Sequence, residues 1–145
     1  MGASKFFSQE QKEIITNAIK SAELNTSGEI RIHIESKCKI DPLDRAAEVF
    51  SKLKMHKTEL RNGVLFYVAI DDHKFAILGD GGINAKVPDE FWDEINNIVV
   101  TLFRDGNYTE GLSQGVIMAG KQLKKFFPHQ LDDVNELSDD ISFGR

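Results

Sequence analysis

The most constraining feature of the sequence is an unbroken apolar run from Val64 to Ile70, VLFYVAI. A run of this length, rich in β-branched and aromatic residues, is typical of a strand that is buried on both faces of a sheet. The polar residues DDHK follow, and the apolar pattern then resumes from Phe75 to Leu78. A polar break of turn length between two apolar runs predicts a β-hairpin, so we expect these two strands to be antiparallel.

Two helices and a further strand are expected before the hairpin. A capping-box motif at Ser8 and apolar residues at helical spacing predict a helix over residues 8–23. Residues 29–35 alternate isoleucine with polar side chains, which predicts a half-buried strand at an edge of the sheet. Asp41 then begins a helix whose apolar stripe extends to Leu53. Strand, helix and strand in this order form a βαβ unit, whose two strands are parallel.

Two more helices are expected after the hairpin. The first opens at Pro88, and the second is capped by Thr109 and runs to about Phe127. Small residues recur every four positions on the second helix, which allows a neighbouring element to pack closely: Gly111, Gly115 and Ala119. The predicted fold class is therefore α/β, with a small mixed sheet and a βαββ core that two helices follow.

Composition limits the classes of partner and site. A chain of 145 residues with 41% hydrophobic residues is long enough for one domain with a core. The net charge of -5 argues against nucleic acid or an anionic membrane surface as the main partner. The single cysteine excludes an intramolecular disulfide and a cysteine-rich zinc site. We predict a flexible acidic C-terminal tail over residues 129–145.

The sequence also predicts where the protein resides. Its first residues lack the apolar segment of a signal peptide, and no apolar run is long enough to span a bilayer. We therefore expect a soluble, cytoplasmic protein.

The topology brings three polar segments to one end of the sheet. Two parallel strands start at this end and the third, antiparallel strand finishes there, so residues 27–29, 61–63 and 79–82 should meet. Glu29 and Asp80 are candidate ligands of calcium or magnesium, because these cations prefer carboxylate oxygens. Candidates for holding an anion are Arg61, Asn62, Gly81 and Gly82. The alternative is that all of these residues only cap strands and turns.

Other chemistry-bearing residues have simpler explanations. Asp71, Asp72 and His73 could ligate a metal, but an exposed hairpin turn needs polar residues in any case. Cys38 has no histidine placed by the sequence to activate it as a nucleophile. His33 is expected at the surface or at an interface. No phosphatase or hydrolase motif occurs in the chain, so the catalytic residues of any enzyme here stay unknown.

Four segments together resemble the TPM domain family: TSGEIRIHI at 26–34, RNGVLFYVA at 61–69, ILGDGGI at 77–83 and FRDGNYTEGLSQGV at 103–116. The resemblance implies a TPM-like domain over residues 1–128 with a three-layer α/β/α sandwich. Relatives include photosystem-repair proteins of thylakoids and bacterial envelope proteins, some with phosphatase activity or calcium binding. The positions that match the polar cleft of the family are Glu29, Arg61, Asn62 and Asp80.

Two functional hypotheses follow. The first is a binding or interaction module whose polar cleft can hold a divalent cation and which engages an unidentified protein. The second is a metal-assisted phosphomonoesterase that acts on a small phosphorylated ligand. The absence of any catalytic motif favours the first.

Overall fold

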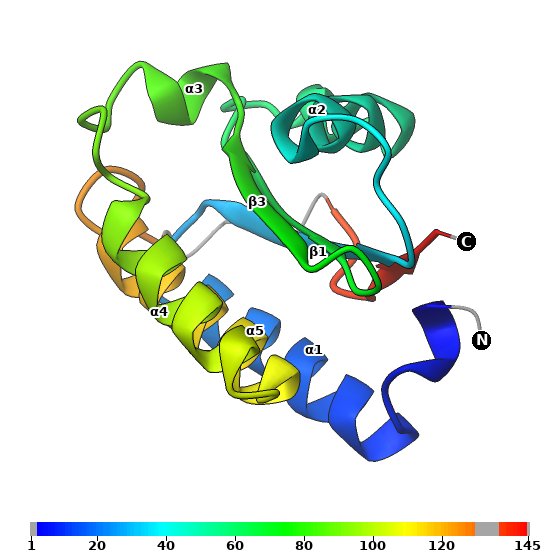
Figure 1. The fold of residues 1–145 in the computed structure, drawn as a ribbon. Helices are drawn as coiled ribbons and strands as arrows, with labels where there is room; N and C mark the ends of the chain where they lie inside the picture. The colour runs from blue at the N-terminus through cyan, green and yellow to red at the C-terminus, as the bar shows by residue number, and fades with distance from the viewer. Residues whose placement is uncertain (1–2, 130–136, 145) are drawn as a thin grey trace.

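The structure is a computed structural model that describes residues 3–129 and 137–144. A mixed four-stranded sheet lies between two layers of helices, with α1, α4 and α5 on one face and α2 on the other (Figure 1). The α/β/α architecture is therefore as expected. In chain order the helices and strands are α1 (Gln9–Glu23), β1 (Glu29–Glu35), α2 (Pro42–Lys52), β2 (Gly63–Ala69), β3 (Lys74–Gly79), α3 (Gly81–Asn84), α4 (Asp93–Arg104), α5 (Tyr108–Leu123) and β4 (Ser142–Phe143). Short 3-10 turns lie at Ala3–Lys5 and Met55–Lys57.

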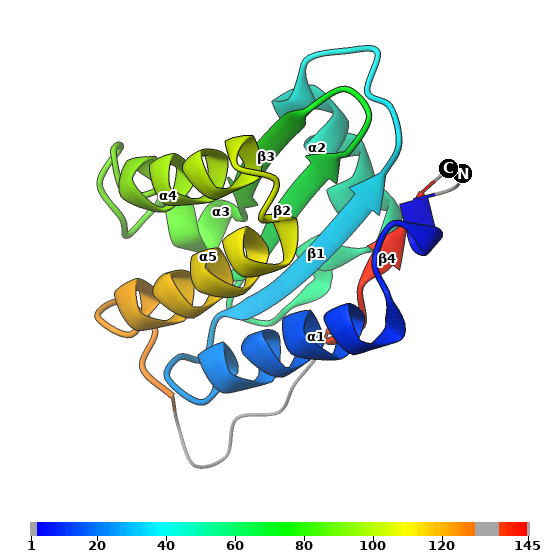
Figure 2. The ribbon, with the colours of Figure 1, turned by 60° about the horizontal axis from the view of Figure 1, so that its bottom comes forward.

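The sheet has the order β3-β2-β1-β4. β1 and β2 are parallel, with Glu29 opposite Gly63, and β2 and β3 are antiparallel, with Val64 opposite Gly79. Both the βαβ unit and the hairpin are thus confirmed. β1 is not an edge strand, however, because β4 pairs with it in parallel on its other side (Figure 2). β4 comes from the end of the chain, for which the sequence predicted no secondary structure.

Both faces of β1 are buried, although the sequence predicted a half-buried strand. Its isoleucines contact the layer of α1, α4 and α5. On the other face His33 and Glu35 are only 6% and 4% exposed. On this face Leu65 and Tyr67 of the neighbouring β2 pack against α2, and Arg45 of α2 bonds to Glu35. The alternation of apolar and polar residues therefore marks two different buried layers, not a buried and a solvent-exposed face.

Helix boundaries differ from the prediction at α4 and α5, neither of which begins with a side-chain cap. The capping box at Ser8 is present as predicted. α4 begins at Asp93 and not at Pro88, because the residues between them form successive turns. α5 begins one residue before Thr109, since the Asn107 carbonyl already accepts the first helical hydrogen bond.

The small residues of α5 allow α4 to lie close to it, as predicted. A Cβ atom added at Gly115 would lie 2.5 Å from Cγ2 of Val99, and one added at Gly111 would lie 2.8 Å from the ring of Phe103. Within residues 3–129 and 137–144, no helix combines the length and the apolar composition that crossing a membrane requires.

Candidate functional site

The three polar segments meet at one rim of the sheet, as the topology predicts. The main-chain N–H of Glu29 donates to the carbonyl of Asn62 at 3.1 Å, and that of Asp80 donates to the carbonyl of Gly63 at 2.9 Å. The beginnings of β1 and β2 and the end of β3 therefore lie side by side. We call this region the polar rim.

The carboxylate of Asp80 is fully engaged by its neighbours at the polar rim. Nε and Nη2 of Arg61 donate to its two oxygens at 2.7 and 2.8 Å, and the N–H of Gly81 donates to Oδ1 at 2.7 Å. Burial opposes ionisation of Asp80, but these hydrogen bonds outweigh it and lower the pKa of the carboxyl. The side chain of Arg61 remains 55% exposed. Asp80 thus caps α3 and anchors an arginine that faces solvent.

Glu29 lies on the same rim, and Gly63 of β2 lies between it and Asp80 in the sheet. Glu29 is 5% exposed, and its Oε1 accepts a hydrogen bond from the N–H of Leu137 at 2.8 Å. A Cβ atom added at Gly63, between the two acids, would lie 3.2 Å from the carbonyl oxygen of Met55 and 3.6 Å from Cδ1 of Leu137. A calcium ion needs oxygen ligands at about 2.3–2.6 Å. One ion bound by both carboxylates would therefore have to displace Met55 and Leu137.

The polar rim does not contain a ready-made metal cluster. No group of three or more histidine, cysteine, aspartate or glutamate residues with the geometry to hold an ion occurs in the part of the chain that the structure describes. The residues present therefore do not fit a resident metal without rearrangement.

Asn62 and Gly82 hold the rim together. Nδ2 of Asn62 donates to the carbonyl of Ser27 at 3.1 Å, which ties the beginnings of β1 and β2. A Cβ atom at Gly82 would lie 2.1 Å from the carbonyl oxygen of Leu60 and 2.6 Å from that of Arg61. Only glycine can fill this position, because main-chain atoms of the neighbouring loop occupy the space of a side chain.

A buried polar network on the α2 side of the sheet was not predicted. Both oxygens of Glu35 accept hydrogen bonds from Arg45, at 2.8 Å from Nε and 3.0 Å from Nη2. Tyr67 donates its hydroxyl to Glu35, and Nε2 of His33 lies 3.1 Å from Oε1. Nδ1 of His33 lies 2.9 Å from Oγ of Ser142, so the network extends to β4. His33 is therefore an interior residue and not the surface residue that we expected.

The network stabilises the ionised form of Glu35. Burial opposes this ionisation, but the hydrogen bonds from Arg45, Tyr67 and His33 together lower the pKa of Glu35 to about 2. Burial raises the pKa of Tyr67, and the hydrogen bond to Glu35 raises it further. With Glu35 only 4% exposed, the network joins α2, β1, β2 and β4 and has little access to a substrate. A buried tyrosine needs a partner for its hydroxyl, which was the available sequence signal.

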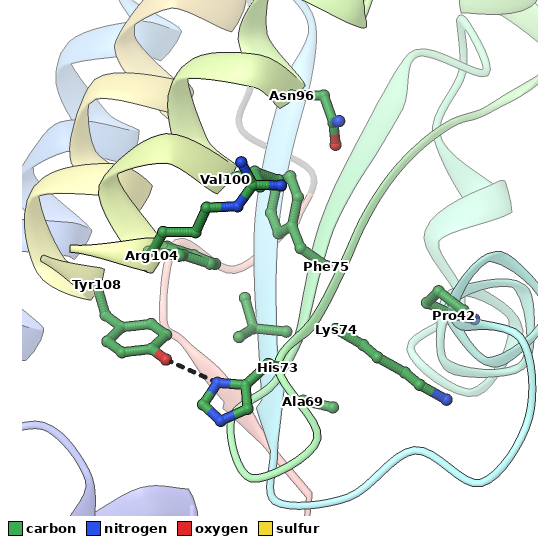
Figure 3. Close-up of a pocket in the computed structure, with 11 residues that line it drawn as sticks. Pro42, Ala69, His73, Lys74, Phe75, Asn96, Val100, Arg104 and Tyr108 are labelled. Atoms are coloured by element: carbon green, nitrogen blue, oxygen red, sulfur yellow. Dashed lines mark hydrogen bonds between the residues drawn. The ribbon is translucent and has the colours of Figure 1, made fainter. Parts of the chain in front are cut away.

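A second, unpredicted site is a groove along the outer edge of β3 (Figure 3). A cavity of about 490 Å³ lies between β3, α4 and the start of α2. A smaller hollow of about 250 Å³ continues it along β3 and shares Pro42, Phe75 and Asn96 with it. We call the two hollows together the β3 groove. Its apolar lining consists mainly of Val68, Phe75, Val100 and Phe103.

Charged side chains divide the β3 groove into two ends. The end near the hairpin turn carries His73, Lys74 and Arg104 (Figure 3), and the other end carries Asp93. Asp41 also lines the second hollow, but it follows Ile40, whose carbonyl accepts a hydrogen bond from Lys74. Nζ of Lys74 donates to two main-chain carbonyls. Among the described residues, neither Lys74 nor Arg104 has an acidic partner within ion-pair distance. The groove brings together residues that are far apart in sequence, which is why sequence reasoning missed it.

Asp72 of the hairpin turn has a structural role. Oδ2 of Asp72 accepts a hydrogen bond from the N–H of Cys38 at 2.7 Å, which anchors the loop before α2. Cys38 itself is buried, and its thiol donates to the carbonyl of Ile40 at 3.1 Å.

Comparison with known proteins identifies relatives of this fold. The family model described as the TPM domain matches residues 3–122. The NMR structure of the BA42 protein from the psychrophilic bacterium Bizionia argentinensis is 48% identical, with 97% of each chain covered and a TM-score of 0.92. The N-terminal domain of a P. gingivalis protein is 20% identical, with 88% of this chain and 83% of that chain covered and a TM-score of 0.71.

A third solved structure, the N-terminal domain of the cg2496 protein from Corynebacterium glutamicum, is 13% identical. The match covers 97% of this chain and 81% of the cg2496 domain, with a TM-score of 0.62. These last two likenesses concern the fold alone. No curated protein matches the chain.

Gly82 and Gly81 are a matched pair for testing the geometry of the polar rim. We expect Gly82→Ala to lower the free energy of unfolding by at least about 2 kcal/mol, because main-chain oxygens cannot move aside as a side-chain tip can. Nothing lies within 4 Å of a Cβ atom at Gly81, so Gly81→Ala should change stability by less than about 1 kcal/mol. Urea unfolding measures both. Equal losses in the two variants would contradict the rim geometry.

Replacement of Glu35 tests the buried network. We expect Glu35→Gln to lose about 2–4 kcal/mol at pH 7, because it leaves Arg45 without its buried partner. The folded-state pKa of Glu35 is about 2 against an ordinary value of 4.5, so its contribution is present above pH 4.5 and is lost as the pH falls toward 2. The unfolding free energy of the variant should therefore depend less on pH across this window.

The control for this experiment is Glu48→Gln. Glu48 also contacts Arg45, at 3.0 Å, but its side chain is 57% exposed. The Glu48→Gln variant should lose less than about 1 kcal/mol of unfolding free energy and keep the acid dependence of the original protein. A Glu35→Gln variant that behaves like Glu48→Gln would show that the network adds little to stability.

Proposed function

We propose that this chain, which belongs to the TPM domain family, is a binding module and that the β3 groove is its binding surface. One observation carries this proposal: the groove combines an apolar lining with cations that have no acidic partner within the described chain. Ligand sites in proteins are typically concave and mostly apolar, with a few polar groups that orient the ligand.

The lining of the groove is well suited to hold an apolar group. Phe75, Val100 and Phe103 are partly exposed, and the rings of Phe75 and Phe103 pack edge to face with centroids 5.5 Å apart. The ring of Phe103 also packs against Tyr108, whose hydroxyl lies 3.2 Å from Nδ1 of His73. These contacts fix the lining before a ligand arrives, so little ordering entropy is lost on binding. With Arg104 beside it, the groove suits a ligand with an apolar body and a negative group.

An apolar sulfonate, 1-anilinonaphthalene-8-sulfonate, tests the proposal. We expect saturable binding, seen by fluorescence, with amide shifts in NMR spectra at Phe75 and Val100. Arg104→Gln should weaken the affinity roughly threefold, because it removes the charge that faces the sulfonate. Lys121→Gln removes an exposed lysine of α5 outside the groove and should leave the affinity unchanged. Binding that shifts other residues, or that ignores Arg104, would contradict the proposal.

A second candidate function is binding of calcium or magnesium at the polar rim, with Asp80 and Glu29 as ligands. One observation favours it: both acids are on the same rim. Since Arg61 occupies both oxygens of Asp80, the cation would bind in exchange for the guanidinium. Met55 and Leu137 would have to move for Glu29 to bind the same cation. The exposed arginine can swing into solvent to make this exchange.

Titration with calcium or magnesium chloride, followed by NMR, tests this exchange. Arg61→Gln should tighten cation binding because it frees the carboxylate of Asp80, whereas Asp80→Asn should abolish it. Shifts should be confined to residues 29, 61–63 and 79–82. Small, uniform shifts, or an unchanged affinity in Arg61→Gln, would rule out a site at the polar rim.

The alternative activity, metal-assisted hydrolysis of a phosphomonoester, would use the same rim. It is supported by the family resemblance, with Arg61 as the group that faces the phosphate. Hydrolysis of p-nitrophenyl phosphate that requires added metal and is lost in Asp80→Asn would establish it. Absence of turnover in wild-type protein that binds the metal would dismiss it.

A further inference from the structure

The outer edge of β3 presents unused main-chain hydrogen-bonding groups. In an antiparallel pair, alternate residues bond to the neighbouring strand and the others point away from it. The hydrogen bond from the N–H of Asp80 to the carbonyl of Gly63 fixes this alternation. The main-chain groups of Ala76 and Leu78 therefore bond to β2, and those of Phe75 and Ile77 point toward the groove. The carbonyl of Gly79, which shares their orientation, accepts a hydrogen bond from Asn84, as an outward-facing group should.

Phe75 and Ile77 are therefore free to bond to an added strand. No described residue makes a hydrogen bond to their main chain on the groove side. Together they offer two donors and two acceptors in the middle of the β3 groove. Addition of a strand to such an edge is a common way in which proteins bind extended peptides.

The shape of the groove favours a single segment over a second copy of the protein. β3 lies on the floor between two walls, Pro42 of α2 on one side and Asn96 and Val100 of α4 on the other (Figure 3). A lone strand, about 4.8 Å from β3, can enter between these walls. A second copy would have to bring its own α2 and α4 against them in order to pair the two edges.

For a segment that runs antiparallel to β3, the charges of the groove indicate which end should be acidic. β3 runs from the end that carries Lys74 and Arg104 toward the end that carries Asp93. A strand antiparallel to β3 therefore has its C-terminal end beside Arg104 and its N-terminal end beside Asp93. Acidic residues at the first end and basic residues at the second would meet opposite charges, whereas the reverse arrangement would place like charges together.

From this geometry we infer that the β3 groove binds an extended segment of a partner protein. The segment adds to the sheet antiparallel to β3, places alternate apolar side chains in the groove, and carries acidic residues at its C-terminal end beside Arg104. This inference rests on the proposed binding role of the groove and adds the class of partner and its direction.

Two synthetic peptides test the inference on the full chain. The first is acetyl-Lys-Lys-Val-Thr-Val-Thr-Val-Glu-Glu-amide, and the second has the reverse sequence. Their central residues read the same in both directions, so the peptides differ only in the end that carries each charge. We expect the first to bind about fivefold or more tightly than the second, and Arg104→Glu to remove or invert this preference. Lys121→Glu, on α5, should preserve it.

Hydrogen exchange followed by NMR supplies the second readout. The first peptide should slow exchange of the amides of Phe75 and Ile77, which bond to nothing else on that side. Equal affinities for the two peptides, or binding that leaves both amides unprotected, would overturn the inference. Peptide-induced dimers would also overturn it, in favour of a second copy at the edge.

Failure of the inference can be distinguished from failure of the proposed function. If the anilinonaphthalene sulfonate occupies the groove but neither peptide does, the inference is wrong and the groove remains a ligand site. If neither the sulfonate nor a peptide reaches Phe75, the groove is not a binding surface at all.

Discussion

The pairing of β2 with its two neighbours is the constraint on which the rest of the structure depends. All seven residues of β2 are buried, with β1 bonded on one side and β3 on the other. A strand this apolar cannot lie at the surface, so it must be central. The tight turn to β3 then leaves β3 as the last strand on its side of the sheet. The polar rim and the open edge of β3 both follow from this one arrangement.

Polar residues at the rim and in the groove differ in what they do. At the polar rim, Asp80 bonds to Arg61 and Gly81, and Asn62 bonds to Ser27, so these groups mostly satisfy one another. The same holds for Glu35 in the buried network. In the groove, Arg104 faces solvent without an acidic partner in the described chain. The charges at the rim and in the network therefore hold the fold together, whereas Arg104 is available to contact a ligand.

The sequence predicts most of the architecture because its signals are local. The apolar run of β2, the hairpin turn and the capping box at Ser8 each depend on neighbouring residues, and all three are present. The convergence of Glu29 and Asp80 on one rim also follows, since it needs only the strand directions. The start of α4 was misplaced because Pro88 can begin a turn as well as a helix.

Other features depend on side chains that meet only in the folded chain. Arg45 comes from α2, the helix that follows β1, and the pattern of β1 alone cannot show that it reaches Glu35. Met55 and Leu137 pack beside Gly63, between Glu29 and Asp80, and the spacing of residues in the sequence does not predict this packing. The β3 groove is formed by the start of α2, β3 and α4, so no single segment carries its signature.

The open outer edge of β3 is the feature on which both the groove and the strand addition depend. Amide hydrogen exchange of the protein without ligand tests, residue by residue, whether this edge is open. We predict slow exchange at Ala76 and Leu78, whose amides bond to β2, and fast exchange at Phe75 and Ile77, whose amides face the groove. Uniformly slow exchange along β3 would show that another element covers this edge, and would contradict both the groove and the strand addition built on it.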